Sequence, residues 1–434
     1  MNKIFNLLLI LIFIFITNCS FHKNSKFWNK EVLVSEEIQN SEKIFKEKKF
    51  IETEFNLNLK IDITSRLRNN SISNNFNNIG RIDFNEIPIS KLKYKYSKIK
   101  NFNQYEPEIV FNKKNIIFFD NKGTILNFDN NSNLLWKKNH YSKKEQKKNP
   151  ILFFANNQKY LIIADTIAKF YVIDINTGEL LWSKTNSAPF NSQIKVFNDK
   201  FFVIDYSNTL NGYFIANGEE ALSIKTQNSL IKSQKKLSMV IVGQNIYFNN
   251  SLGDISSVNI ESEELIWQSP TRNNLIINDS FFLKTSNIVA DNDNLYFSNN
   301  RNQFFSIDQQ TGNTNWLQEI SSDLRPVIIN DLIFTITLKG YLTVVDKNNG
   351  NIIRVNDIFK GMKIHKKDNV KPTGFIVGKN SFFITTSNGR LLEVDIKSGQ
   401  TKSITKIDNS IIYRPSILNK SMFIITDNSI IKLK

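Results

Sequence analysis

Short hydrophobic runs recur along the chain at a regular spacing. Each run holds four or five mostly apolar residues, includes β-branched or aromatic side chains and ends at a polar position, as a buried β-strand does. The runs recur roughly every 44 residues, which indicates an internal structural repeat. They are IIFFD ending at Asp120, LIIAD at Asp165, FFVID at Asp205, IYFNN at Asn250, LYFSN at Asn299, IFTIT at Thr337, FFITT at Thr386 and FIITD at Asp427.

A second signature follows most of these runs, and its clearest copy is Asp174-Ile-Asn-Thr-Gly178-Glu-Leu-Leu-Trp182. The aspartate can bond its own turn backbone, and glycine accepts the positive φ that closes a tight hairpin. The tryptophan has a long apolar face to bury against the neighbouring repeat. The same place is taken, in chain order, by Trp136, Trp182, Leu222, Trp267, Trp316, Arg354 and Ser403. The hydrophobic runs and the Asp–Gly–Trp signature recur with the same period, so two independent patterns establish the repeat.

Each repeat holds four short strands, which is typical of a propeller blade and not of a helical solenoid. The eighth repeat stops at Lys434, after its third strand. The alternating segment Ser90–Lys100 precedes the first complete repeat and can supply the missing strand, which would remove the free edges. The sequence therefore predicts an all-β, eight-bladed propeller over residues 90–434, closed by an N-terminal strand.

The first residues have the form of an export signal. Lys3 precedes the apolar run Leu7–Ile16, which is too short to span a bilayer comfortably. The run ends in Ile-Thr-Asn-Cys19, which resembles a bacterial lipobox, although Asn18 stands where a small residue is usual. The resemblance implies a lipoprotein signal peptide over 1–18, a lipid on Cys19 and a partly irregular tether over 19–89. An ordinary signal peptide followed by a chance cysteine is the alternative.

Composition removes several function classes. Cys19 is the single cysteine in the sequence, and the three histidines are far apart, which excludes a disulfide scaffold, a zinc ribbon and a CxxC redox site. The net charge is +16, but nine of the 56 basic residues are arginine and the lysines are scattered. A nucleic-acid site favours clustered arginine, so biased composition explains the charge, with weak attraction to an anionic membrane surface as the alternative.

Other candidate chemistry has a structural explanation. The chain lacks the GxGxxG, GxxxxGK[ST], HExxH and GxSxG motifs. Glu219-Glu220 and Glu263-Glu264 fall at or beside predicted hairpin turns, where exposed charge is usual. His140 and His365 stand in lysine-containing polar stretches and are expected to be exposed. Lys93-Tyr94-Lys95-Tyr96 has the aromatic and basic content of a single-strand nucleic-acid site, but its alternation favours sheet closure.

The Asp-x-x-x-Gly-x-x-x-Trp signature resembles the tryptophan-docking motif of eight-bladed propellers of the pyrroloquinoline-quinone type, over roughly residues 90–434. In those proteins the tryptophan belongs to the contact between blades. The resemblance therefore implies a structural role and not a ligand-binding role. The residues concerned are Trp136, Gly178, Trp182, Trp267, Gly312 and Trp316.

This group has two branches with different functions. Quinone-dependent dehydrogenases carry the cofactor and a calcium ion in the channel, and many alcohol-oxidising members add a vicinal cysteine pair. The BamB family has a lipobox, a short tether and a propeller without a cofactor, and this chain resembles it. The resemblance implies a non-enzymatic, lipid-anchored scaffold on the periplasmic face of the outer membrane, with neither a metal, a small-molecule substrate nor a nucleic acid. A quinone-dependent dehydrogenase and an adaptor for another envelope partner stay open as alternatives.

In the BamB family, loops at one face contact the periplasmic domains of the assembly barrel BamA, and possibly nascent outer-membrane barrels. The family's apolar-plus-basic contact stretch is best matched by Ser229-Leu230-Ile231-Lys232-Ser233. The resemblance implies that Leu230, Ile231 and Lys232 bind the partner, with lysine standing where the family prefers arginine. No acidic contact residues match after Ile277. Ordinary strand core is the alternative for Leu230 and Ile231.

Overall fold

A computed structural model describes residues 53–72, 75–88, 90–100, 105, 107–271, 281–360 and 369–434. These residues belong to one unit of the chain, Phe50–Lys434. Cys19, the signal peptide and His365 lie outside the described residues. Among the residues described, no helix has both the length and the apolar character needed to cross a membrane.

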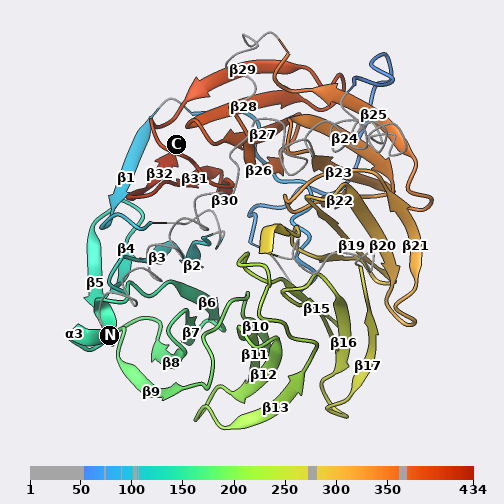
Figure 1. The fold of residues 1–434 in the computed structure, drawn as a ribbon. Coiled ribbons are helices and arrows are strands. Elements are labelled where there is room, and N and C mark those ends of the chain that lie inside the picture. Colours follow the sequence, from blue (N-terminus) through green and yellow to red (C-terminus); the bar gives the residue numbers. More distant parts are fainter. Residues whose placement is uncertain are drawn as a thin grey trace, which may run out of the picture. The chain divides into compact units, whose positions relative to one another are not determined.

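The described residues of this unit form eight antiparallel sheets of four strands each, arranged in a ring (Figure 1). This confirms the predicted eight-bladed propeller. Within blades 1 to 7, the chain runs from the innermost strand to the outermost one. Blade 1 consists of β2 (Val110–Asn112), β3 (Asn115–Phe119), β4 (Ile125–Phe128) and β5 (Leu134–Lys138), and blade 2 of β6 (Leu152–Asn156), β7 (Tyr160–Asp165), β8 (Lys169–Asp174) and β9 (Leu180–Thr185). Blade 3 consists of β10 (Lys195–Phe197), β11 (Lys200–Ile204), β12 (Thr209–Phe214) and β13 (Glu220–Lys225), and blade 4 of β14 (Met239–Val242), β15 (Asn245–Asn249), β16 (Ile255–Asn259) and β17 (Leu265–Ser269).

Blades 5 to 8 repeat the same order, and one short helix, α3 (Lys143–Gln146), connects blades 1 and 2 among the described residues. Blade 5 consists of β18 (Val289–Ala290), β19 (Asn294–Asn299), β20 (Gln303–Asp308) and β21 (Thr314–Gln318), and blade 6 of β22 (Val327–Ile329), β23 (Leu332–Ile336), β24 (Tyr341–Asp346) and β25 (Ile352–Asp357). Blade 7 consists of β26 (Pro372–Val377), β27 (Ser381–Thr386), β28 (Arg390–Asp395) and β29 (Thr401–Lys406), and blade 8 of β30 (Ser416–Leu418), β31 (Ser421–Ile425), β32 (Ser429–Leu433) and β1 (Lys91–Lys95).

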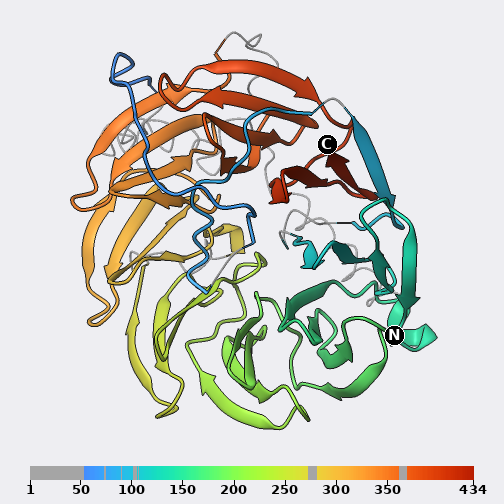
Figure 2. The ribbon, with the colours of Figure 1, turned by 180° about the vertical axis from the view of Figure 1, so that it is seen from behind.

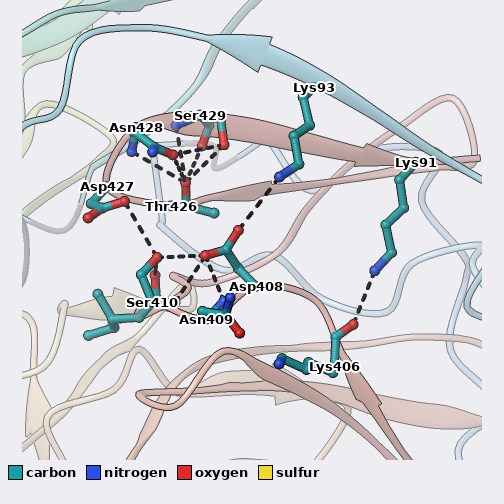
Figure 3. A network of polar contacts seen from close by, with 11 residues as sticks. Lys91, Lys93, Lys406, Asp408, Asn409, Ser410, Thr426, Asp427, Asn428 and Ser429 are labelled. Atoms are coloured by element: carbon teal, nitrogen blue, oxygen red, sulfur yellow. Dashed lines mark hydrogen bonds and ion pairs between the residues drawn. The ribbon is translucent and has the colours of Figure 1, made fainter.

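The N-terminal strand β1 closes the ring as predicted, because it pairs antiparallel with the C-terminal strand β32. Tyr94 of β1 is fully buried against blade 1, which excludes the alternative that its ring stacks on nucleic acid. On the other side, β1 contacts blade 7. Lys93 lies 3.8 Å from the Asp408 carboxylate, and Lys91 donates to the Lys406 carbonyl at 3.1 Å (Figure 3).

The turn that opens each signature forms from local hydrogen bonds. The Asp174 carboxylate accepts from the backbone N–H groups of Asn176 and Thr177, both at 2.9 Å. Gly178 has a φ of +75° and donates its N–H to the Asp174 carbonyl. A side chain at that φ would be strained, which explains why glycine stands at this point of the turn.

Each of the four tryptophans of the repeat signature packs against the turn glycine of the next blade. Trp136 covers Gly178, Trp182 covers Gly218 of blade 3, Trp267 covers Gly312 and Trp316 covers Gly350, so closely that a Cβ at any of these glycines would lie within 3.0 Å of the indole. In three of the four, the indole N–H also bonds the next blade: Trp182 donates to the Ile215 carbonyl at 2.9 Å, Trp267 to the Gln309 carbonyl at 3.0 Å and Trp316 to the Lys347 carbonyl at 3.0 Å. These contacts join consecutive blades.

Arg354 stands at the tryptophan position of blade 6. It also joins its blade to the next one, but through guanidinium hydrogen bonds instead of an indole ring. Its side chain is fully buried, and its Nη2 donates to the Ile396 carbonyl at 2.9 Å, at the same point of the next turn. Nη1 donates to the carbonyl of Leu59, upstream of the propeller, at 3.0 Å. Burial lowers the pKa of Arg354 to about 10, so the guanidinium stays charged at neutral pH.

Residues 53–72 and 75–88, here called the N-terminal strap, cross one face of the ring (Figure 2). The strap bonds the innermost strands of several blades in turn. The Asn75 and Phe76 carbonyls accept from Ile241 of β14 and Ala290 of β18 at 3.1 and 2.9 Å, and Ile82 donates to Val377 of β26 at 2.8 Å. The strap therefore ties blades 4, 5 and 7 together.

The centre of the strap differs from what its polar sequence indicates. The stretch Asn69–Asn78 has the composition of an exposed loop, yet Asn77 is fully buried. Its side-chain amide donates to the carbonyls of Met239 and Ile288 at 3.0 and 2.9 Å, and its Oδ1 accepts from Lys195 Nζ at 2.6 Å. A buried amide is stable where its hydrogen bonds are satisfied, which pattern alone does not reveal.

Candidate partner-binding surface

The loop between β13 and β14 presents apolar side chains to solvent. Leu230 is fully exposed and Ile231 is more than one third exposed, and both lie in a bend outside any strand. The alternative that these two residues belong to a strand core is therefore wrong. Lone exposed leucines are ordinary, so the meaning of this loop depends on its neighbours.

Lys232 is anchored beside the two apolar residues. Its Nζ donates to the Tyr206 carbonyl and, at 2.8 Å, to Asn228 Oδ1. Burial lowers the pKa of Lys232, while the Asp205 charge acts in the opposite direction. The lysine therefore has a fixed position and not the freedom of a typical surface lysine, which reduces the side-chain entropy that a partner contact would cost.

A second exposed apolar group lies between blades 4 and 5. The side chains of Phe281 and Phe282 are 51% and 71% exposed, and their rings pack edge to face with centroids 5.3 Å apart. The next residue, Leu283, is buried. The repeat pattern of the sequence does not predict this pair. One feature of the sequence could have indicated it: two adjacent aromatic residues stand in a long connection between repeats, where no strand is expected.

One hydrogen bond joins the two apolar groups. Ser233 Oγ donates to the Leu283 carbonyl at 2.6 Å, and the Ser233 N–H donates to the Ser251 carbonyl at 2.9 Å. Ser233 itself is buried. The bond holds the two loops side by side, at residues adjacent to their exposed tips.

These residues form what is called here the apolar patch: Leu230, Ile231, Phe281 and Phe282. Lys232 lies beside it, and exposed Lys284 follows it in the chain. Burying one such side chain in an interface stabilises by about 1.5–3 kcal/mol, and aromatic residues are common anchors of protein–protein contacts. Four of them beside basic groups form a surface suited to a partner with apolar and acidic groups.

A cavity of about 450 Å³ lies within the propeller channel, and residues of six blades line it. Such a channel is where a quinone cofactor with calcium would lie. Among the lining residues described, Glu108 is the carboxylate, and Arg325 Nη2 pairs with it at 2.9 Å. No group of His, Cys, Asp and Glu among the described residues has the geometry to hold a metal. The donor set does not fit calcium or the quinone that calcium would orient.

His140 corrects an expectation. The sequence indicates an exposed loop, but the imidazole is half-buried, with Nε2 3.1 Å from the Gly178 carbonyl and its ring against Tyr171. Burial, which is only partly opposed by the contact with the Gly178 carbonyl, lowers the pKa of His140. The residue therefore belongs to the contact between blades 1 and 2.

Comparison with known proteins separates the possible families. The family model described as "Outer membrane protein assembly factor BamB" matches residues 121–356, which is more than half of the chain. The chain belongs to the BamB family. This match lies within the repeat region and includes Leu230, Ile231 and Lys232. Among curated proteins, no sequence matches this chain.

Solved structures share the propeller fold at low sequence identity. The crystal structure of BamB from Moraxella catarrhalis is 14% identical, covers 80% of this chain and 99% of its own, and has a TM-score of 0.63. A europium-containing methanol dehydrogenase is 10% identical over 82% and 88% of the two chains, with a TM-score of 0.61. The quinohemoprotein alcohol dehydrogenase of Comamonas testosteroni is 9% identical over 80% and 76%, with a TM-score of 0.55. At such identities these likenesses establish the fold alone.

Proposed function

We propose that this BamB-family chain is a non-enzymatic scaffold subunit of the machinery that assembles β-barrel proteins in the outer membrane. In this proposal, it binds the periplasmic domains of the BamA-like assembly barrel through the apolar patch and Lys232. Nascent outer-membrane barrels are further partners of the same kind. The observation that carries the proposal is the Ser233–Leu283 bond, because it joins two exposed apolar loops into one surface.

The chemistry of the patch supports binding and not catalysis. Leu230, Ile231, Phe281 and Phe282 provide contact area without a nucleophile or a general base. Lys232 adds a positioned charge, although lysine lacks the planar fork of arginine and makes a single-point contact. An acidic or carbonyl-rich strip on the partner would complement it.

The same proposal places the protein in the cell on the basis of its N-terminal sequence. Cleavage before Cys19 and lipidation of its sulfur would anchor the chain to the periplasmic face of the outer membrane. The residues after Cys19 would span the distance to the strap. An anchor of this kind holds the patch near membrane-embedded partners and raises their effective concentration.

Affinity capture tests the proposal. The tagged, membrane-anchored chain is mildly crosslinked in cells, purified, and its co-purifying proteins are identified by mass. We expect a large barrel with periplasmic repeat domains, with less recovered for Lys232→Glu than for the exposed control Lys144→Glu. Recovery of no barrel would contradict the proposal. Dye reduction by the same protein after addition of quinone and calcium would then support the dehydrogenase alternative.

A further inference from the structure

A groove of about 570 Å³ on the N-terminal strap is lined by arginine. The strap supplies Arg66, Arg68 and Arg81, and residues 328–330 of blade 6 complete the wall, which includes neither aspartate nor glutamate. Three of the nine arginines in the sequence therefore line one groove, although most of the 56 basic residues are lysine. Because lysine is the common basic residue of this chain, the gathering indicates a site that uses guanidinium groups.

Backbone carbonyls hold two of these arginines in place. The Arg68 N–H donates to the Arg81 carbonyl at 2.9 Å, so the two residues stand side by side. Arg68 Nη1 donates to the Asn78 carbonyl at 2.8 Å, and Arg81 donates to the carbonyls of Ile63, at 2.6 Å, and Lys379. These bonds fix the guanidinium groups but leave their charge in place, because a carbonyl carries no net charge.

The carboxylates of the strap are engaged elsewhere. Three of them pair with lysines of the propeller: Glu54 with Lys360 at 2.8 Å, Asp62 with Lys397 at 2.8 Å and Asp83 with Lys420 at 3.6 Å. Among the described residues, no carboxylate forms an ion pair with Arg66, Arg68 or Arg81, and Arg66 makes no hydrogen bond. Burial lowers the pKa of Arg81, whereas a neighbouring carboxylate would raise it. The groove is therefore positively charged and open to an anion.

Exposed apolar side chains stand on the strap before and after the groove residues. Before them, a turn closed by the Leu59 N–H and the Asn56 carbonyl at 3.2 Å exposes Phe55, Leu57 and Leu59. After them, Ile72 is about half exposed. Exposed apolar groups beside basic groups are typical of a segment that lies on a membrane surface. The strap therefore combines both kinds of contact that such a surface offers.

The groove and the apolar patch lie on opposite faces of the ring. Because neighbouring strands of a blade are antiparallel, its first and third turns open on one face, and the connections between blades open on the other. The strap contacts first turns, since Asn330 between β22 and β23 lines the groove and Lys379 between β26 and β27 accepts from Arg81 (Figure 2). The patch stands on connections between blades, before β14 and β18. A ligand of the groove therefore leaves the patch accessible.

We propose that the strap face binds the surface of an anionic phospholipid bilayer, with lipid phosphate groups in the arginine groove. Guanidinium groups hold phosphate through paired N–H donors, and each basic residue near an anionic leaflet adds about fivefold in affinity. The apolar turn at Leu57 and the side chain of Ile72 enter the boundary between headgroups and acyl chains. This contact goes beyond the proposed assembly function, since it needs neither the barrel nor a lipid on Cys19.

A fluorescent probe in the groove tests the proposal on the purified full chain. Cys19→Ser removes the single cysteine, and Asn69→Cys, at an exposed position of the groove, then carries an environment-sensitive dye. The apolar run Leu7–Ile16 attaches the chain to any vesicle, so the dye reports the strap and not the anchor. We expect a blue shift on vesicles of equal parts phosphatidylcholine and phosphatidylglycerol, and little shift on phosphatidylcholine alone. A dye at Lys144→Cys, on the connection between blades 1 and 2, should show none.

Three variants locate the contact. Arg66→Gln disturbs no hydrogen bond of the fold and should at least halve the shift, and Arg66→Gln with Arg68→Gln should abolish it. Arg390→Gln, which follows the second turn of blade 7 on the other face, should leave the shift unchanged. An equal shift on both kinds of vesicle, or a shift retained by the folded double variant, would overturn the proposal. No shift on vesicles, with a response to inorganic phosphate at matched ionic strength, would also overturn it and assign the groove to a soluble phosphate.

Discussion

Ser233 Oγ lies 2.6 Å from the Leu283 carbonyl oxygen, and this bond couples the loop before blade 4 to the loop before blade 5. Both partners are buried, while Leu230 and Ile231 of one loop and Phe281 and Phe282 of the other are exposed. The arrangement gives a rigid base to two apolar tips. A binding surface with such a base has less ordering entropy to lose on association.

Replacing Ser233 by alanine tests whether this base matters for binding. The change leaves a buried carbonyl without its donor and should lower the free energy of unfolding by about 1 kcal/mol. Because the two loops then move independently, barrel recovery by affinity capture should fall as well. Ser262→Ala, at an exposed turn, is the control and should change neither quantity. Unchanged recovery for Ser233→Ala would show that the loops need no coupling.

Leu230→Asp separates binding from folding. The side chain is fully exposed, so the free energy of unfolding should stay within about 0.5 kcal/mol of the original. Affinity for the isolated periplasmic domains of the barrel should fall at least tenfold, because a charge enters an apolar contact. Leu134→Asp on the outer strand β5 is the matched control, since that leucine is also exposed but lies in blade 1. An equal loss of affinity for both variants would contradict the proposal that the apolar patch binds the barrel.

Arg354 should matter for stability as much as a tryptophan does. Arg354→Ala removes the donors to Ile396 and Leu59, leaves the buried Ile396 carbonyl unpaired and opens a cavity where a large buried side chain stood, at a cost of about 3–5 kcal/mol. Trp316→Ala should cost a similar amount by leaving a cavity. Ser403→Ala, at the same position of blade 7, should cost less than about 1 kcal/mol. Denaturant unfolding measures all three, and a small loss for Arg354→Ala would contradict its role as a blade contact.

Two glycines distinguish backbone strain from crowding. Gly350 has a φ of +76°, and a Cβ there would lie 2.6 Å from Trp316 Cδ2. Gly243 has a φ of +59° with nothing within 4 Å of such a Cβ. Alanine should cost about 1–2 kcal/mol at Gly243 from strain alone, and about 1–3 kcal/mol more at Gly350. Equal costs in denaturant unfolding would show that the tryptophan is not tightly docked.

Asp165 predicts a specific pH dependence of stability. Burial, only partly opposed by its hydrogen bonds, raises the pKa of this carboxyl to about 6 from an unfolded value near 3.8. The folded state therefore binds the proton more tightly, so this group's contribution is full below pH 3.8 and is lost as the pH rises through 6. Asp165→Asn should remove that loss from denaturation curves between pH 4 and 7. A variant with the same pH slope as the original would exclude Asp165 as its source.

The repeat made most of the fold predictable. Apolar runs and the Asp–Gly turn locate the strands because they report local conformation and burial, as the hydrogen bonds to Asp174 illustrate. The closing strand β1 was predictable because the last repeat lacks a strand. Arg354 was found only as an exception to the pattern, since its function depends on a carbonyl more than forty positions away.

The contacts of the strap and the Phe281–Phe282 half of the apolar patch were harder to predict from the sequence. The Asn77 side chain has five hydrogen-bonding partners from distant blades, and no local pattern encodes such contacts. Phe281 and Phe282 stand outside the repeat, so a period-based interpretation passes over them. Leu230 and Lys232 came from resemblance to a family and not from a physical signal in the sequence.

The central claim is that the apolar patch contacts the assembly barrel. Its most direct test places a photo-crosslinking amino acid at position 230 of the membrane-anchored chain in cells and identifies the attached protein by mass. The same residue at position 134 serves as the control. The account predicts a crosslink from position 230 to a periplasmic domain of the barrel and none from position 134. Crosslinks from both positions alike, or a different protein at position 230, would contradict it.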